Sequence, residues 1–114
     1  MDVGEFEPRG PESPYGVAED GCPAVLMLDL RGHNGTCVAF PYDQLRTIAF
    51  DPVEGVRLEF QEHRVRLCGR NLRRLYDLLV VKRVTFVQEG DLDVLPESST
   101  FVDGIHVERM DDLV

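Results

Sequence analysis

Basic side chains gather between residues 63 and 83, and they are the strongest feature of the sequence that could do chemistry. The stretch holds six arginines and one lysine against the single acid Asp77. A guanidinium group can bind carboxylate or phosphate oxygens through two parallel hydrogen bonds. The candidate anion-binding residues are Arg64, Arg66, Arg70, Arg73 and Arg74. The competing explanation is an ordinary solvated surface whose arginines pair with nearby acids, because charged side chains are mostly exposed.

The two ends of the chain carry the opposite charge. Residues 1–30 contain seven acids and one base, residues 31–83 contain six acids and ten bases, and residues 84–114 contain eight acids and one base. The 114 residues carry a net charge of −9. An Arg-rich face would thus be masked by acidic flanks. Because a protein with this charge repels phosphate, nucleic-acid binding is an alternative that we do not favour.

Catalytic and metal-binding motifs give no comparable signal. The sequence contains three cysteines and three histidines, but no G-x-S-x-G, H-E-x-x-H, P-loop or dinucleotide-binding pattern. The pairs His33 with Cys37 and His63 with Cys68 lack the knuckle spacing of a zinc site. We predict no metal and no cofactor, and we assign no catalytic residue. A small enzyme that sets His63 or His106 beside a carboxylate is the last alternative.

The strands and the helix that would position these side chains are predicted from the spacing of the apolar residues. Five strands are expected between residues 24 and 68, as an antiparallel meander that forms a curved sheet or partial barrel. Pro41-Tyr42-Asp43 interrupts the ladder between the second and third strands. One helix follows at about residues 71–81, and one or two further strands follow it at about 84–88 and 101–108. The fold class is therefore α+β.

Two hairpins fix which side chains stand opposite each other. In the first, a three-residue loop ending at Gly35 sets Leu30 opposite Val38 and Leu28 opposite Phe40, so the apolar faces match. The second hairpin allows two registers. A two-residue loop sets Arg57 beside Arg66, whereas a four-residue loop sets Glu59 beside Arg66. Because like charges opposite each other are unfavourable, we predict the four-residue loop.

The helix begins where the apolar period changes. Leu72, Leu75, Tyr76 and Leu79 fall on one stripe at helical spacing. Asn71 stands directly before this stripe and is expected to cap the helix. The helix should end near Val80 or Val81, because Lys82 and Arg83 would otherwise turn onto the apolar side.

The junction between the last meander strand and the helix resembles a known motif. Residues 65–72, Val-Arg-Leu-Cys-Gly-Arg-Asn-Leu, are similar to the second sequence motif of the Sm-like RNA-binding proteins. In that family a strand ends in an Arg-Gly-Asn-type turn that touches RNA. The family continues into another strand and normally places its helix first, whereas this chain turns helical at Leu72 and begins with a Pro/Gly-rich arm. The resemblance covers eight residues and does not assign the chain to the family.

The domain organisation is predicted to be simple. Residues 1–23 form a flexible acidic arm rich in proline and glycine, residues 24–108 form one α+β domain, and residues 109–114 form a frayed acidic tail. No apolar run approaches the roughly 20 residues of a membrane span, and no signal peptide is visible. The odd number of cysteines without C-x-x-C spacing predicts free thiols. The cytoplasm is the expected location.

Exposed apolar residues give the leading functional hypothesis. Val25 and Met27 are expected on the outer face of the first strand, and Val81 on the polar side of the helix. Such leftovers favour a small non-enzymatic domain for protein–protein interaction or oligomerisation, whose partner is a second copy or another protein. The alternative is an anion-binding module, for RNA or a phosphorylated ligand, that uses the Arg-rich face.

Overall fold

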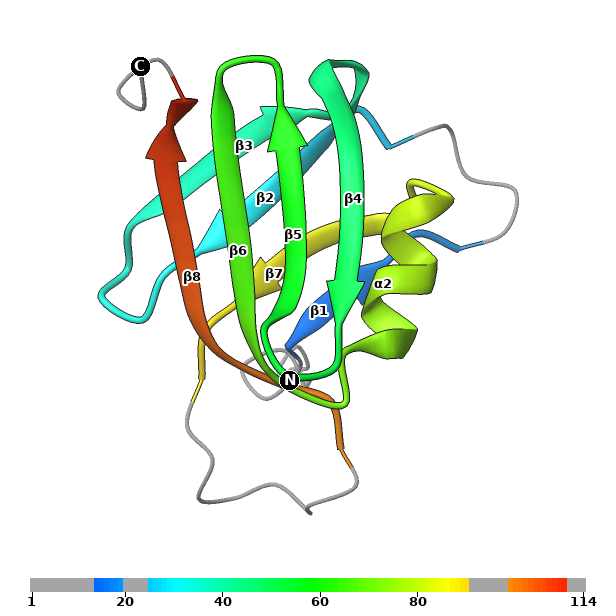
Figure 1. The fold of residues 1–114 in the computed structure, drawn as a ribbon, viewed down its shortest axis with the longest axis vertical. Helices are drawn as coiled ribbons and strands as arrows, with labels where there is room; N and C mark the ends of the chain where they lie inside the picture. Colours follow the sequence, from blue (N-terminus) through cyan, green and yellow to red (C-terminus); the bar gives the residue numbers. More distant parts are fainter. Residues whose placement is uncertain (1–13, 20–24, 91–98, 111–114) are drawn as a thin grey trace, which may run out of the picture.

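The protein is an α+β domain built from two four-stranded sheets and one helix (Figure 1). The computed structural model describes residues 14–19, 25–90 and 99–110. Sheet A has the strand order β1 (Tyr15–Val17), β7 (Val84–Gln88), β2 (Met27–Arg31) and β3 (Cys37–Pro41). Sheet B has the order β4 (Leu45–Asp51), β5 (Gly55–Phe60), β6 (His63–Arg70) and β8 (Phe101–Arg109). Helix α2 spans Arg73–Val80.

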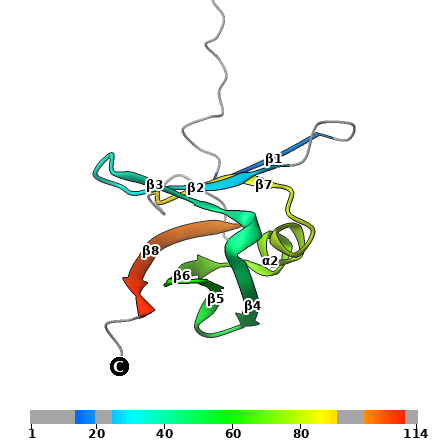
Figure 2. The ribbon, with the colours of Figure 1, turned by 90° about the horizontal axis from the view of Figure 1, so that it is seen from above.

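The two sheets face each other across the core. Figure 1 shows sheet B in front of sheet A, with the strands of the two sheets crossing at an angle. Figure 2 shows helix α2 on the side of β1 and β4, while β3 and β8 lie on the other side. Between the layers pack Leu28 and Leu30 of sheet A, Leu58 and Leu67 of sheet B, and Leu75 of the helix, all almost fully buried. The helix therefore closes one open side of the pair of sheets.

The first hairpin has the predicted register. Leu30 stands opposite Val38 and Leu28 opposite Phe40. Gly35 takes a φ of 91°, which only glycine adopts without strain. The Gly32 N–H donates to the Thr36 carbonyl at 2.7 Å and closes the loop. Matching apolar faces thus identify this pairing correctly.

The predicted single meander of five strands is not confirmed, because β3 and β4 belong to different sheets. A short 3₁₀ turn, η2 (Tyr42–Gln44), carries the chain from one sheet to the other. Its first residue, Tyr42, is buried between the layers, and its hydroxyl donates to the Val84 carbonyl at 2.7 Å. Burying this ring turns the chain into the second layer. Sheet B is antiparallel, and the described strands form no closed barrel.

The prediction for the second hairpin is wrong. Arg57 stands opposite Arg66 and Glu59 opposite Arg64, which is the register of the two-residue loop. The Glu59 carboxylate lies 3.4 Å from Arg64 Nε and 3.6 Å from Arg57 Nε, so one acid offsets two bases. In this register the repulsion between Arg57 and Arg66 is therefore reduced by Glu59. A comparison of directly opposite side chains does not include this diagonal contact.

Helix α2 ends at Val80 as expected, but Asn71 does not cap it. Asn71 has a φ of 56°, and the residue at the N-cap position is Leu72, which makes no side-chain cap. The Asn71 side-chain amide instead donates to the Ser99 carbonyl at 2.9 Å, and the Thr100 hydroxyl donates to the Asn71 carbonyl at 2.7 Å. Asn71 thus holds the β6–α2 turn against the start of β8.

The strands after the helix divide between the sheets. β7 returns to sheet A and pairs in parallel with β2, whereas β8 pairs antiparallel with β6. Within the stretch predicted as a flexible arm, Tyr15–Val17 forms β1 and pairs with β7. Residues 1–13 and 20–23 of the predicted arm lie outside the described residues, as do residues 111–114 of the predicted tail.

Two of the three apolar side chains that the sequence predicts to be exposed are exposed in the structure. Met27 and Val81 retain about half of their surface, at 45% and 59%. Val25, in contrast, is partly buried and packs against the core. The expectation of exposure is therefore wrong for Val25.

Candidate functional site

The five predicted anion-binding arginines do not form one surface. Arg64 and Arg66 lie on the outer face of β6 and line a common hollow. Arg70 lies at the far end of β6, with its Cζ 5.7 Å from the centre of the Phe101 ring. On the helix, Arg73 Nε lies 3.1 Å from the Asp77 carboxylate, and Arg74 is exposed. Arg64 and Arg66 are thus the two predicted residues that the structure brings together at one hollow of the described surface.

That hollow lies on the outer face of sheet B and has a volume of about 370 Å³. Three of its lining residues come from the β5–β6 hairpin and two from β8. They are Arg57, Arg64, Arg66, His106 and Glu108, with Glu54 of the β4–β5 turn at one end. Sequence reasoning missed Arg57 and His106. The alternation within β5 already places Arg57 on the outer face, but no local pattern shows that β8 pairs with β6.

Cross-strand register sorts these side chains into two rows. In one row, Arg66 stands between Arg57 of β5 and His106 of β8. In the other, Arg64 stands between Glu59 and Glu108. We call the first the basic row (Arg57, Arg66, His106) and the second the paired row (Glu59, Arg64, Glu108). Directly opposite side chains are about 5 Å apart at Cβ, so opposite charges within a row attract and like charges repel.

The two rows differ in how their charges are compensated. In the paired row, Arg64 Nε is 3.4 Å from the Glu59 carboxylate, which also lies near Arg57. The structure gives Arg66 no ion pair within the described residues, and both of its cross-strand neighbours are basic side chains. Arg57 and Arg66 are both exposed, and so is His106. The basic row therefore offers donors to an anion from solvent.

A second hollow lies between the two sheets, on the side away from the helix. It is a groove of about 470 Å³ between the edge strands β3 and β8. Its walls are Leu30, Val38, Ile105 and Val107, and its polar end is formed by Gly32, His33, Asn34, Thr36 and Glu89. Val38 and Val107 remain 40% and 41% exposed. The sequence does not reveal the groove, because its walls come from segments about 70 residues apart.

Glu89 is the acid of this groove. Its Oε1 accepts a hydrogen bond from the His33 backbone N–H and its Oε2 accepts one from the Ile105 N–H, both at 2.7 Å. The carboxylate thereby links the tip of the β2–β3 hairpin to β8. Among the described lining residues there is no lysine or arginine, so the groove presents a negative charge beside apolar walls.

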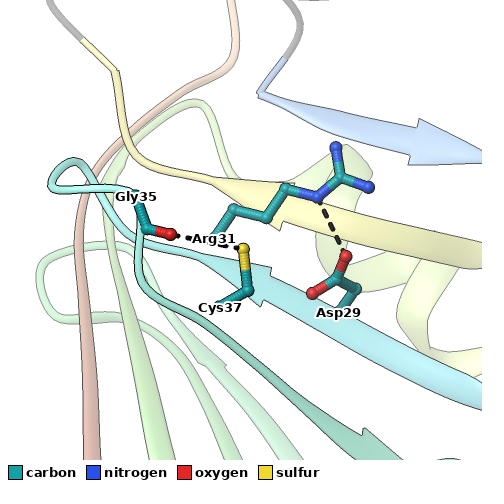
Figure 3. A network of polar contacts seen from close by, with 4 residues as sticks. All are labelled: Asp29, Arg31, Gly35 and Cys37. Atoms are coloured by element: carbon teal, nitrogen blue, oxygen red, sulfur yellow. Dashed lines mark hydrogen bonds and ion pairs between the residues drawn. The ribbon is translucent and has the colours of Figure 1, made fainter.

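The histidines and cysteines do not assemble a reaction centre in the described residues. The His63 ring lies 4.9 Å from the Phe40 ring, and His106 lines the hollow beside Arg66. Within the described residues, neither imidazole makes a hydrogen bond to a carboxylate. Cys37 is exposed, and Figure 3 shows its thiol directed toward the Gly35 carbonyl, at 3.8 Å, while Arg31 is directed toward Asp29. No group of three or more histidine, cysteine, aspartate or glutamate side chains in this part of the chain is arranged to hold a metal ion.

The pKa values of Tyr42 and Asp51 are shifted, and both shifts come from contacts that hold the fold. Burial raises the pKa of Tyr42 to about 12, against a smaller opposing effect of its hydrogen bond to Val84. The backbone N–H groups of Glu54 and Val53 hold the pKa of Asp51 below its usual range, because they donate to its carboxylate in the β4–β5 turn. Neither group lies in the groove or in the basic row.

Comparison with known proteins gives no relative. No protein-family model matches the chain, no curated protein matches it, and no solved structure matches it. None of the helices in the described residues has the length and apolar character needed to cross a membrane. A functional argument therefore rests on the two hollows.

Proposed function

We propose that the protein is a small non-enzymatic domain that works through protein contacts, and that the groove between β3 and β8 is its binding surface. The observation that carries the proposal is the placement of β3 and β8, each the edge strand of its sheet within the described residues, on either side of an apolar cleft. An edge strand presents backbone N–H and C=O groups that can pair with another chain. Peptide binding by strand addition combines such pairing with pockets for alternate side chains.

The occupant is an extended segment of a partner protein that carries a lysine or arginine. Val38 and Val107 both line the groove and would contact an apolar side chain of that segment. Glu89 has two carboxylate oxygens, each with one backbone donor, and a carboxylate can accept about four hydrogen bonds. It can therefore receive a cation without losing its present partners. The net charge of −9 favours the approach of a basic segment and opposes a second copy of this chain.

Selection from a phage-displayed library of random peptides tests this function with the full chain. We expect the enriched peptides to have apolar residues at alternate positions and at least one lysine or arginine. Their affinity should fall at least tenfold for Val107→Glu, which places a second negative charge beside the apolar wall. Val53→Glu is the matched control, because Val53 is 92% exposed in the β4–β5 turn, remote from the groove lining.

Three results would contradict the proposal. Selected peptides that bind Val107→Glu and the unsubstituted chain equally would show that they use another surface. Enrichment no greater than for an unrelated protein would exclude a peptide groove. A dimer seen by light scattering that dissociates in Val107→Glu would make a second copy, and not a basic partner, the occupant.

A further inference from the structure

We infer that the basic row on the outer face of sheet B is a binding site for the phosphate group of a small phosphorylated metabolite. The row lies on a different surface from the peptide groove, and the inference stands independently of that proposed function. Its basis is the register that aligns Arg57, Arg66 and His106 across three neighbouring strands. An anion placed over Arg66 would meet donors from all three.

Within the basic row, Arg66 gains no cross-strand ion pair from this register, because both of its neighbours are basic side chains. Like charges that stand directly opposite each other on an antiparallel pair are destabilising. The paired row one step along the same strands shows the ordinary solution, in which Arg64 alternates with Glu59 and Glu108. The basic row departs from that pattern at Arg66, whose neighbours on both sides are basic. A bound dianion would supply the missing negative charge.

The size and rim of the hollow favour a small ligand. Its volume of about 370 Å³ lies in the range of small-molecule sites, about 300–1,000 Å³. Glu54 and Glu108 line the hollow together with the basic row. These carboxylates repel an extended polyanion such as RNA, but they can accept hydrogen bonds from hydroxyl groups next to a single phosphate. The chemical class that fits is therefore a phosphate monoester of a hydroxylated molecule.

Titration with sulfate is the first test, because sulfate keeps two negative charges throughout the pH range of interest. The readout is the change in the NMR signals of the arginine Nε–H groups and of the His106 ring, with the full chain at low salt. Arg57→Gln and Arg66→Gln should each weaken sulfate binding about tenfold, since each removes a charge-assisted hydrogen bond. Arg74→Gln is the matched control, because it removes an exposed arginine on the helix.

The position of His106 gives a second readout. It stands on β8 opposite Arg66 of β6 and lines the same hollow. His106→Ala should weaken sulfate binding about threefold, because it removes one hydrogen-bond donor of the row. Unchanged sulfate affinity in His106→Ala would overturn the role given to His106.

Binding of glycerol 3-phosphate and of a 12-nucleotide single-stranded RNA distinguishes a small phosphorylated metabolite from a nucleic acid as the ligand. We expect glycerol 3-phosphate to bind more tightly than inorganic phosphate, and the gain to disappear in the Glu54→Gln, Glu108→Gln double variant. Tighter binding of the RNA, lost in Arg66→Gln, would show that the row serves nucleic acid and would overturn the inference. Equal weakening by Arg66→Gln and Arg74→Gln would exclude a specific site altogether.

Discussion

Arg57 and Arg66 stand directly opposite each other on β5 and β6, on the outer face of sheet B. Glu59, two residues from Arg57 on the same strand, lies 3.6 Å from Arg57 Nε, but it lies still closer to Arg64. Arg66 is thus left between Arg57 and His106. Within these two rows, Arg64 thus belongs to an ordinary cross-strand ion pair, whereas Arg66 stands between two basic neighbours.

Charge reversal at two neighbouring positions should have opposite effects on stability. Arg66→Glu places an acid between Arg57 and His106, and we expect it to raise the free energy of unfolding by about 0.5 kcal/mol. Arg64→Glu places an acid between Glu59 and Glu108, and we expect a loss of about 0.5–1 kcal/mol. Urea denaturation at low salt measures both changes, and both should shrink in 1 M salt. Destabilisation by Arg66→Glu would mean that the basic row has compensation that its register does not reveal.

Tyr42 should make the protein sensitive to alkali. Its pKa is raised to about 12 in the folded protein, above the value of 10.0 expected when unfolded. Its contribution to stability is therefore complete below about pH 10 and declines as the pH rises toward 12. Tyr42→Phe removes the hydrogen bond to the Val84 carbonyl and should cost about 1–2 kcal/mol at pH 7. Unfolding measured from pH 7 to 11.5 should show a smaller alkaline loss in Tyr42→Phe. An unchanged alkaline profile would contradict this assignment.

The parts of the fold that could be predicted are those determined by neighbouring residues. The register of Leu28 and Leu30 against Phe40 and Val38 follows from matching apolar faces over a short loop. The helix and β7 can be predicted because the spacing of the apolar residues changes within about 20 residues. A comparison of directly opposite charges favours the wrong β5–β6 register, because it does not include the Glu59 carboxylate that two arginines share.

The parts that could not be predicted depend on distant segments. The break at Pro41 is visible in the sequence, but its consequence, a second sheet, depends on burying Tyr42 beneath Val84. His106 reaches Arg66 only because β8 pairs with β6, and Glu89 reaches Ile105 only because the two sheets are stacked. For this reason the sequence indicates Arg64 and Arg66 as candidate anion-binding residues but does not show which other arginines lie near them. The fold places Arg70, Arg73 and Arg74 away from the hollow that Arg64 and Arg66 line.

Glu89 should be important for stability as well as for binding. Its carboxylate accepts the backbone N–H groups of His33 and Ile105, and no single replacement keeps both contacts and the charge. Glu89→Ala should therefore lower the free energy of unfolding by about 1–3 kcal/mol. Hydrogen exchange should accelerate at the His33 and Ile105 amides more than in the core of β5. Uniform acceleration across sheet B would show that the effect is global and that Glu89 does not hold this contact locally.

Gly16 should be required for β1 to pair with β7. It stands opposite Phe86, and a Cβ atom at this position would overlap the Phe86 ring. On its other side the ring is covered by the Arg31 guanidinium, whose Cζ lies 4.1 Å from the ring centre. Movement of the ring toward Arg31 would therefore disturb this contact.

Gly16→Val should detach β1 from β7 and expose the edge of β7 that β1 covers. We expect faster amide exchange at Phe86 and Gln88 and a loss of about 1–3 kcal/mol, the usual cost of overpacking. The double variant Gly16→Val, Phe86→Ala provides the control, because removing the ring opens space for the new side chain. Recovery of slow exchange in the double variant would confirm conflict with the Phe86 ring as the cause. The same fast exchange in both variants would show that the ring is not the cause and would leave the Thr85 hydroxyl, which a Cβ atom at Gly16 would also overlap.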